Sequence, residues 1–177
     1  QRKIPSAIPI TIANVALSRN KEWCATIDWH ESTACVYRIQ DGQCVRKISG
    51  TWPGIDLALS NDGTRLYTSF GGGDVSCWNV ADGTRLWQRT LVSGINALWL
   101  LPDGDRLLVG LHEDYFMNGA QKGCLLLDVR TGATLSEHAG GTFKRTPHVS
   151  AAGDVRIIGA TNGTCYNITQ NTQEFTA

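Results

Sequence analysis

Histidine and glutamate stand side by side at two places in the sequence, as His30 with Glu31 and as His112 with Glu113. Imidazole and carboxylate groups both bind divalent metals, so the two pairs could hold one ion between them. Adjacent residues point apart on a strand, however, so each pair offers about one ligand, and the sequence identifies no third ligand. Solvated loop charge is the favoured interpretation, and we predict no metal site.

The six cysteines show no C-x-x-C spacing of the kind found in zinc and redox sites. Free cysteine is among the most buried residue types, so small apolar core residues with reduced thiols are the favoured interpretation. A redox or metal ring is the alternative. Reduced thiols are typical of the cytoplasm, where we place the protein, and the sequons at Asn162 and Asn167 would matter in a secreted chain.

The glycine triplet at 71–73 suggests a phosphate loop, but such a loop leads into a helix with a lysine and a hydroxyl. Here "DVSCWNV" follows, which has the pattern of a strand, so we predict a hairpin turn. No G-x-S-x-G elbow accompanies Ser60 or Ser76, and the histidines are scattered along the chain. We therefore predict no catalytic residue and no cofactor, although a triad assembled in space would escape a linear search.

Composition excludes several classes of partner. Sixteen basic residues balance sixteen acidic ones over 177 residues, so no global charge draws the protein to nucleic acid or to anionic lipid. The longest apolar runs are shorter than the roughly 20 residues that span a bilayer. The first residues, "QRKIPSAIPI", have the character of a processed or excised end rather than of a signal peptide. Any partner must be recognised locally.

An internal repeat organises the chain. Ile39, Val80, Val129 and Ile168 align at the end of the third strand of each copy and are spaced by 41, 49 and 39 residues. Each copy reads as a short strand, a turn, a second strand, a variable loop and a third strand. The second strands are predicted at 23–28, 65–70, 106–112 and 155–161. In the first three copies a further turn opens a fourth strand, whereas the chain stops soon after the third strand of the fourth copy. Asp-Gly between alternating runs is a strong hairpin signal, because glycine supplies positive φ.

No segment has the 3.6-residue apolar period of a helix, so the predicted class is all-β. Four-stranded antiparallel repeats of roughly 40 to 45 residues are the size of propeller blades, and radial stacking buries faces that one blade leaves open. We predict a β-propeller of about four blades. The predicted ranges are 13–50, 54–92, 95–138 and 147–177, with residues 1–12 as an extension or outer strand.

The order of strands and turns resembles the WD-repeat family of β-propellers, best in "LSNDGTRLYTSF" with "DVSCWNVADG" and in "LPDGDRLLVGL" with "CLLLDVRTG". The family's Gly-His dipeptide is missing, and its Trp-Asp pair appears in part, as Trp78-Asn79 and Leu127-Asp128. In one copy, "WNVADGTRLWQ" is similar to quinoprotein dehydrogenase repeats. The WD-repeat resemblance implies a binding scaffold. The quinoprotein likeness implies the alternative, an enzyme with a quinone cofactor or hydrolytic site in the central funnel.

Whether the ring is complete stays open between three alternatives. The chain is a segment of a larger propeller, a half that pairs with another chain, or a compact four-bladed ring. Closed propellers have about four to eight blades, and four would be a strained minimum.

The variable loops between second and third strands should emerge on the same face as the connections between blades. Aromatic side chains are enriched at protein interfaces, so we predict a protein partner bound through this face. The predicted contact residues are Trp29, His30, Trp52, His112, Tyr115 and Phe116. The other tryptophans, Trp23, Trp78, Trp87 and Trp99, lie in predicted strands and should pack between blades.

Overall fold

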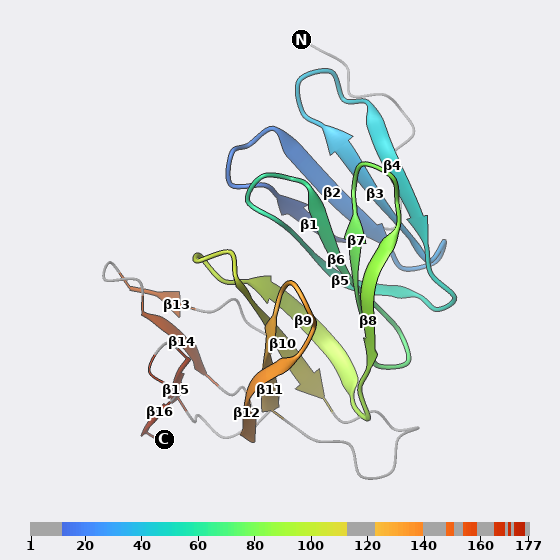
Figure 1. Cartoon of the computed structure of the whole chain (residues 1–177). Helices are drawn as coiled ribbons and strands as arrows, with labels where there is room; N and C mark the ends of the chain where they lie inside the picture. Colours follow the sequence, from blue (N-terminus) through green and yellow to red (C-terminus); the bar gives the residue numbers. More distant parts are fainter. Residues whose placement is uncertain are drawn as a thin grey trace. The chain divides into compact units, whose positions relative to one another are not determined.

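A computed structural model of the chain describes residues 12–112, 123–139, 148–150, 154–158, 165–168, 170 and 172–175. These residues form sixteen strands and, within the described ranges, no helix (Figure 1). The strands are β1 (Ile12–Leu17), β2 (Trp23–Asp28), β3 (Thr33–Arg38), β4 (Cys44–Ser49), β5 (Gly54–Leu59), β6 (Arg65–Phe70), β7 (Asp74–Asn79), β8 (Arg85–Thr90), β9 (Gly94–Leu100), β10 (Arg106–His112), β11 (Gly123–Asp128), β12 (Thr134–Ala139), β13 (His148–Val149), β14 (Val155–Ile158), β15 (Cys165–Asn167) and β16 (Thr172–Phe175).

The strands form four sheets of four strands, each a meander in chain order. We call them blade 1 (β1–β4), blade 2 (β5–β8), blade 3 (β9–β12) and blade 4 (β13–β16). The described strand pairings are all antiparallel, as in β2 with β3 and β6 with β7. The all-β propeller prediction is confirmed.

Two differences from the predicted strands are small but instructive. The fourth copy has a fourth strand, β16, which the sequence interpretation missed because no Asp-Gly or Thr-Gly turn precedes it. The third strands also end one residue early, because Ile39, Val80, Val129 and Ile168 leave the ladder. Their backbone N–H groups instead donate to carbonyls at the start of the second strand of the same blade. The four acceptors belong to Glu22, Thr64, Asp105 and Val155. The predicted alignment of these four residues is thereby confirmed.

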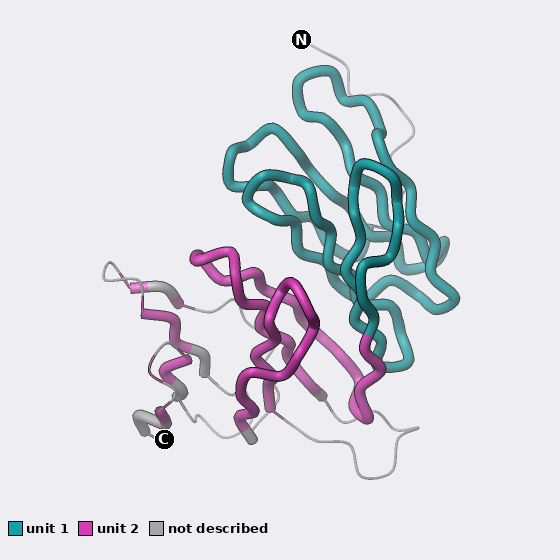
Figure 2. The backbone as a smooth tube through the Cα atoms, viewed as in Figure 1, with its two compact units in different colours: residues 1–88 teal, residues 89–177 magenta. Residues whose placement is uncertain are grey.

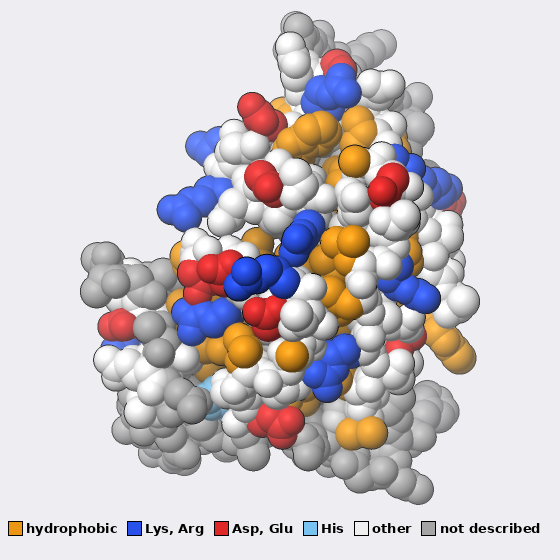
Figure 3. Space-filling model, viewed as in Figure 1, with side chains coloured by type: hydrophobic (Ala, Val, Ile, Leu, Met, Phe, Trp, Pro, Cys, Tyr) orange, Lys and Arg blue, Asp and Glu red, His pale blue; other side chains and the backbone are white. Residues whose placement is uncertain are grey.

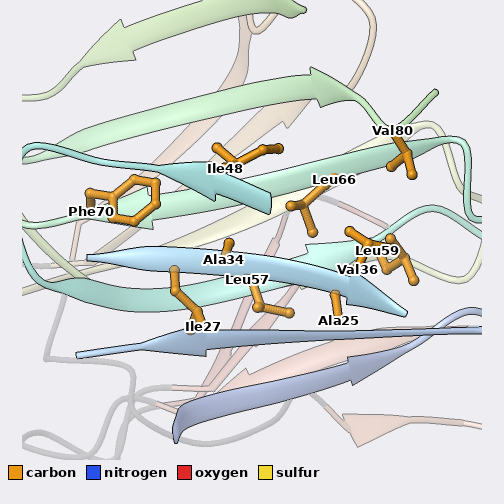
Figure 4. Close-up of a cluster of buried hydrophobic side chains, with 10 residues drawn as sticks. All are labelled: Ala25, Ile27, Ala34, Val36, Ile48, Leu57, Leu59, Leu66, Phe70 and Val80. Atoms are coloured by element: carbon orange, nitrogen blue, oxygen red, sulfur yellow. The ribbon is translucent and has the colours of Figure 1, made fainter. Parts of the chain in front are cut away.

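The chain divides into two compact units, residues 1–88 and 89–177 (Figure 2). In the first unit, blades 1 and 2 share one apolar core (Figure 4). Blade 1 contributes Ala25, Ile27, Ala34, Val36 and Ile48, and blade 2 contributes Leu57, Leu59, Leu66, Phe70 and Val80. Trp23 and Trp78 pack against this core, as predicted. Trp87 lies beside Tyr67 of its own blade, with ring centroids 6.2 Å apart.

In the second unit, blades 3 and 4 share a smaller core. Its members are Leu101, Leu108, Cys124 and Leu126 of blade 3 with Val155 and Ile168 of blade 4. Trp99 packs against it, as predicted. In both units, therefore, neighbouring sheets pack face to face, which is the arrangement that removes apolar sheet faces from water.

Glycine with positive φ sits at the turns that join first to second strands, as Gly63 at 74° and Gly104 at 76°. Blade 1 places Lys21 at the same point of its turn, with φ of 60°. The turn hydrogen bonds match, because Lys21 N–H donates to Ser18 and Gly63 N–H donates to Ser60. Lysine pays a steric cost in this conformation that glycine does not.

Arg46 of blade 1 is hydrogen bonded to blade 2 at the turn 80–84 between β7 and β8. Its Nε donates to the carbonyl of Val80 over 2.9 Å, and its Nη2 donates to the carbonyl of Ala81. The same turn is closed by Asp82, whose carboxylate accepts from both the backbone N–H and the hydroxyl of Thr84. These two hydrogen bonds from Thr84 hold the pKa of Asp82 below its usual value.

Candidate partner-binding site

Three connections meet at one end of the first unit. They are the turn 29–32 between β2 and β3, the connection 50–53 between the blades, and the turn 71–73 between β6 and β7. Gly50 N–H donates to the Ser32 carbonyl over 2.7 Å, and Gly71 N–H donates to the Pro53 carbonyl over 2.9 Å. These backbone bonds tie the connections to one another, and we call the three segments together the loop end.

Trp52 lies against the turn formed by Gly71, Gly72 and Gly73, which we call the glycine turn. A Cβ atom at Gly71 would come within 3.3 Å of the Trp52 Cβ, and one at Gly72 within 3.6 Å of the indole Nε1. Gly72 and Gly73 also have positive φ, of 86° and 80°. The predicted hairpin turn is confirmed. Its glycines both allow the tight reversal and leave room for the indole, which is still 58% exposed.

Trp29 stands on the neighbouring turn and is 47% exposed. The turn is held by the buried carboxylate of Asp28, which accepts from Glu31 N–H over 2.6 Å, and by Thr33 Oγ1, which donates to the Glu31 carbonyl. His30 and Glu31 are exposed beside it. A backbone that is already ordered by hydrogen bonds loses little conformational entropy on binding. Such a turn with a large exposed aromatic side chain is suited to a contact surface.

The structure brings Trp29, His30 and Trp52 to the loop end, whereas the other predicted contact residues belong to blade 3. His112 is the last residue of β10. Tyr115 and Phe116 lie outside the described residues, as do Asn162 and the residues around Glu113. The partner-binding role of all six residues stays a prediction.

The thiols separate by exposure. Among the described residues, five cysteines are free: Cys35, Cys77 and Cys124 are buried, Cys24 is half-buried and Cys44 is exposed. Burial raises the pKa of the Cys77 and Cys124 thiols to about 12 and also raises that of Cys24. The three buried thiols agree with the prediction that cysteines serve as small core residues, whereas Cys44 on β4 does not. Cys165 has no described side chain.

One contact escaped the sequence search. Ser136 Oγ and His138 Nε2 lie 3.2 Å apart on β12, the fourth strand of blade 3. Burial lowers the pKa of His138, which favours the neutral ring. The spacing i, i+2 places both side chains on one face of a strand, and this period could have found the pair. Within the described ranges, no three histidine, cysteine or acidic side chains gather as metal ligands.

Charge does not single out a site. On the face shown in Figure 3, basic and acidic side chains are interspersed, in keeping with the equal numbers of the two in the sequence. The described part of the chain has no helix that is long and apolar enough to cross a membrane.

Curated relatives share part of the sequence. The chain is 32% identical over 81 residues to transducin-like enhancer protein 2 of Mus musculus, which covers 45% of this chain and 11% of that protein. It is 28% identical over 114 residues to protein groucho of Drosophila melanogaster, covering 64% and 15%. Both are WD-repeat proteins, so the WD-repeat-like prediction is confirmed. This chain spans a small part of each relative, and no family model matches it.

Several solved structures superpose on the chain. BamB from Moraxella catarrhalis matches with a TM-score of 0.75 at 15% identity, covering 93% of this chain and 49% of that one. The Cps50 (Swd1) β-propeller domain of Myceliophteria thermophila matches with 0.71 at 15%, covering 99% and 57%. Hydrazine synthase of Kuenenia stuttgartiensis matches with 0.72 at 13%, covering 92% and 52%. At these identities the likeness concerns the fold alone.

Proposed function

We propose that the chain is a non-catalytic scaffold that binds a protein partner through its loop end, as a subunit of a complex in the cytoplasm. Trp29 and Trp52 form the centre of the contact, with His30 beside them. His112, Tyr115 and Phe116, which belong to blade 3 in the sequence, are proposed as partner contacts of the second unit. The similarity to WD-repeat proteins supports a scaffold, and the equal numbers of basic and acidic residues favour a protein over nucleic acid.

One observation carries this proposal: two tryptophans are about half exposed on backbone segments that are tied by hydrogen bonds. Tryptophan is a preferred energetic centre of interfaces, since it offers a large apolar surface with few rotatable bonds. Elsewhere in the described chain the tryptophans pack against cores or other rings.

The test is capture of partners from the native source by the wild-type chain and by Trp29→Ala, Trp52→Ala and the double variant. Leu86→Ala and Leu135→Ala serve as matched controls, because both remove exposed apolar side chains from fourth strands instead. We expect the double variant to lose a specific partner that the controls retain. Equal capture by all variants, with unchanged far-UV circular dichroism, would contradict the assignment of the loop end.

A hydrolytic activity is the second candidate, favoured by the 3.2 Å contact of Ser136 with His138. A neutral imidazole can accept the proton of a serine hydroxyl, which is the first requirement of a nucleophilic serine. The pair lies on the edge strand β12. Labelling with a fluorophosphonate that disappears in Ser136→Ala would establish this activity, and absence of labelling would exclude a reactive serine there.

A further inference from the structure

Two cysteines of blade 1 meet across neighbouring strands. Cys35 lies on the third strand, β3, and in the register of the sheet it stands opposite Lys47 of β4. Two residues further along β3, Tyr37 stands opposite Cys44, the first residue of β4. Because residues two apart on a strand share a face, the two cysteines are diagonal neighbours on the same side of the sheet. Their thiols are hydrogen bonded to each other.

The repeat does not require this pair. Counted from the glycine in the turn between third and fourth strands, Ser76 of blade 2 takes the position of Cys35. On the same count, Arg85 takes the position of Cys44, and its Cζ atom lies 5.5 Å from the centroid of the Trp78 ring. A blade therefore forms without sulfur at either position, and the thiol pair is a property of blade 1 rather than of the repeat.

The two thiols differ in their access to solvent. Cys44 is exposed, and its Sγ donates to the carbonyl of Arg46 over 3.4 Å. Cys35 is 8% exposed, and burial raises the pKa of its thiol, which favours the neutral form. Oxidants react with accessible thiolates, so an oxidant in solution reaches Cys44 before Cys35. Cys35 is shielded from that oxidant but is in contact with the sulfur that the oxidant modifies.

We propose that Cys35 and Cys44 are an oxidation site of blade 1 and form a reversible disulfide when the protein meets hydrogen peroxide. The Cys44 thiolate attacks one peroxide oxygen, the O–O bond breaks, and the leaving hydroxide takes up the proton that the thiol had lost, which leaves a sulfenic acid. The Cys35 sulfur then attacks the Cys44 sulfur. The S–S bond forms, the S–O bond breaks, and the leaving hydroxide takes the Cys35 proton as water. Two thiols are oxidised by two electrons, and the peroxide is reduced to two water molecules.

Closing the disulfide requires a local movement, and β4 is the strand that can make it. Two bonded sulfur atoms lie about 2 Å apart, closer than two free thiols in contact. β4 is the last strand of its sheet, so it pairs with β3 alone. The register of this pair also shifts between Val36 and Tyr37. An edge strand with such an irregularity can be displaced without moving the rest of the sheet.

The test treats the purified protein with hydrogen peroxide, alkylates the remaining thiols in denaturant and maps the cross-link by mass spectrometry. We expect the intact mass to fall by two hydrogen atoms, and four of the six cysteines to be alkylated. One cross-linked pair of peptides should contain Cys35 and Cys44. Dithiothreitol should restore alkylation of all six cysteines, because a dithiol reduces the disulfide by exchange.

Three variants separate this pair from the other thiols. Cys24→Ser is the matched control, because Cys24 stands opposite Tyr37 on the same face of blade 1, and this variant should form the cross-link as the wild-type protein does. Cys35→Ser and Cys44→Ser should both lose it. In Cys35→Ser the sulfenic acid of Cys44 has no thiol to attack it, so dimedone should label Cys44 in this variant and not in the wild-type protein.

Circular dichroism of the reduced variants reports on folding. Serine occupies the position of Cys35 in blade 2, and Cys44 is exposed, so both substitutions suit the fold. Alkylation of all six cysteines after peroxide treatment of the wild-type protein would overturn the proposal. A cross-link between other cysteines or between two chains would overturn it as well, as would an unchanged cross-linked mass in Cys44→Ser.

Discussion

Blades 1 and 2 follow the same plan, yet they differ in what their apolar residues do. The core between them buries Leu59 of blade 2, while Leu17 at the equivalent position of blade 1 is exposed. Their turns differ as well, because Gly63 occupies in blade 2 the left-handed position that Lys21 occupies in blade 1. A side chain's position within the repeat decides which face of the blade it lies on. The blade's place in the row of blades decides whether another sheet covers that face.

The largest expected effect is on the shared core. Leu59→Ala should lower the free energy of unfolding by about 2 to 4 kcal/mol, because it removes a buried side chain and leaves a cavity. Leu17→Ala should cost less than about 0.5 kcal/mol, because the Leu17 side chain is 62% exposed. Urea unfolding followed by tryptophan fluorescence gives both values. Equal losses would contradict the exposure of Leu17.

The turns should show the next largest effect. Gly63→Ala forces a side chain into the left-handed region and against the Trp23 indole, where the new Cβ would come within 2.1 Å of Cδ1. We expect a loss of about 2 kcal/mol. Lys21→Gly should stabilise the protein by about 0.5 kcal/mol, since relief of strain exceeds the added entropy of the unfolded chain. Changes of the same sign in both variants would contradict the equivalence of the two turns.

Alkaline pH distinguishes the blades through Cys77 of blade 2, whose position is occupied by Val36 in blade 1. Burial raises the pKa of Cys77 from 9.0 to about 12, so the folded state favours the neutral thiol. Its contribution to stability is present below pH 9 and is lost as the pH rises towards 12. The wild-type protein should therefore lose free energy of unfolding between pH 7 and pH 10. We expect this loss to be about 1 kcal/mol smaller in Cys77→Val. Unfolding free energies at pH 7 and pH 10 for both proteins check this, and identical pH dependence would contradict burial of the thiol.

The smallest effect on stability should come from the loop end. Trp29→Ala should change the free energy of unfolding by less than about 0.5 kcal/mol, because the side chain is half exposed. Trp52→Ala should cost somewhat more, since its indole covers the glycine turn. Loss of partner capture with these small changes would separate binding from folding, whereas a large loss of stability would make Trp52 a structural lid.

The sequence alone determined the strands and their order. Alternating apolar residues and Asp-Gly turns are local signals, so β2, β6 and β10 have the bounds that the pattern predicted. The predicted alignment of Ile39, Val80, Val129 and Ile168 is confirmed for the same reason, because one hydrogen bond recurs in each copy. β16 was missed because the turn before it lacks the local signal.

Only the tertiary structure decided which apolar side chains are covered, since burial depends on a neighbouring sheet that can come from any part of the chain. Leu17 and Leu59 occupy the same place in the repeat, beside the turn between first and second strands, but packing against blade 1 covers Leu59 alone. The contact of Trp52 with Gly71 and Gly72 likewise joins segments that are about 20 residues apart in the sequence. Such contacts carry no local pattern, because they depend on how two sheets stack in space.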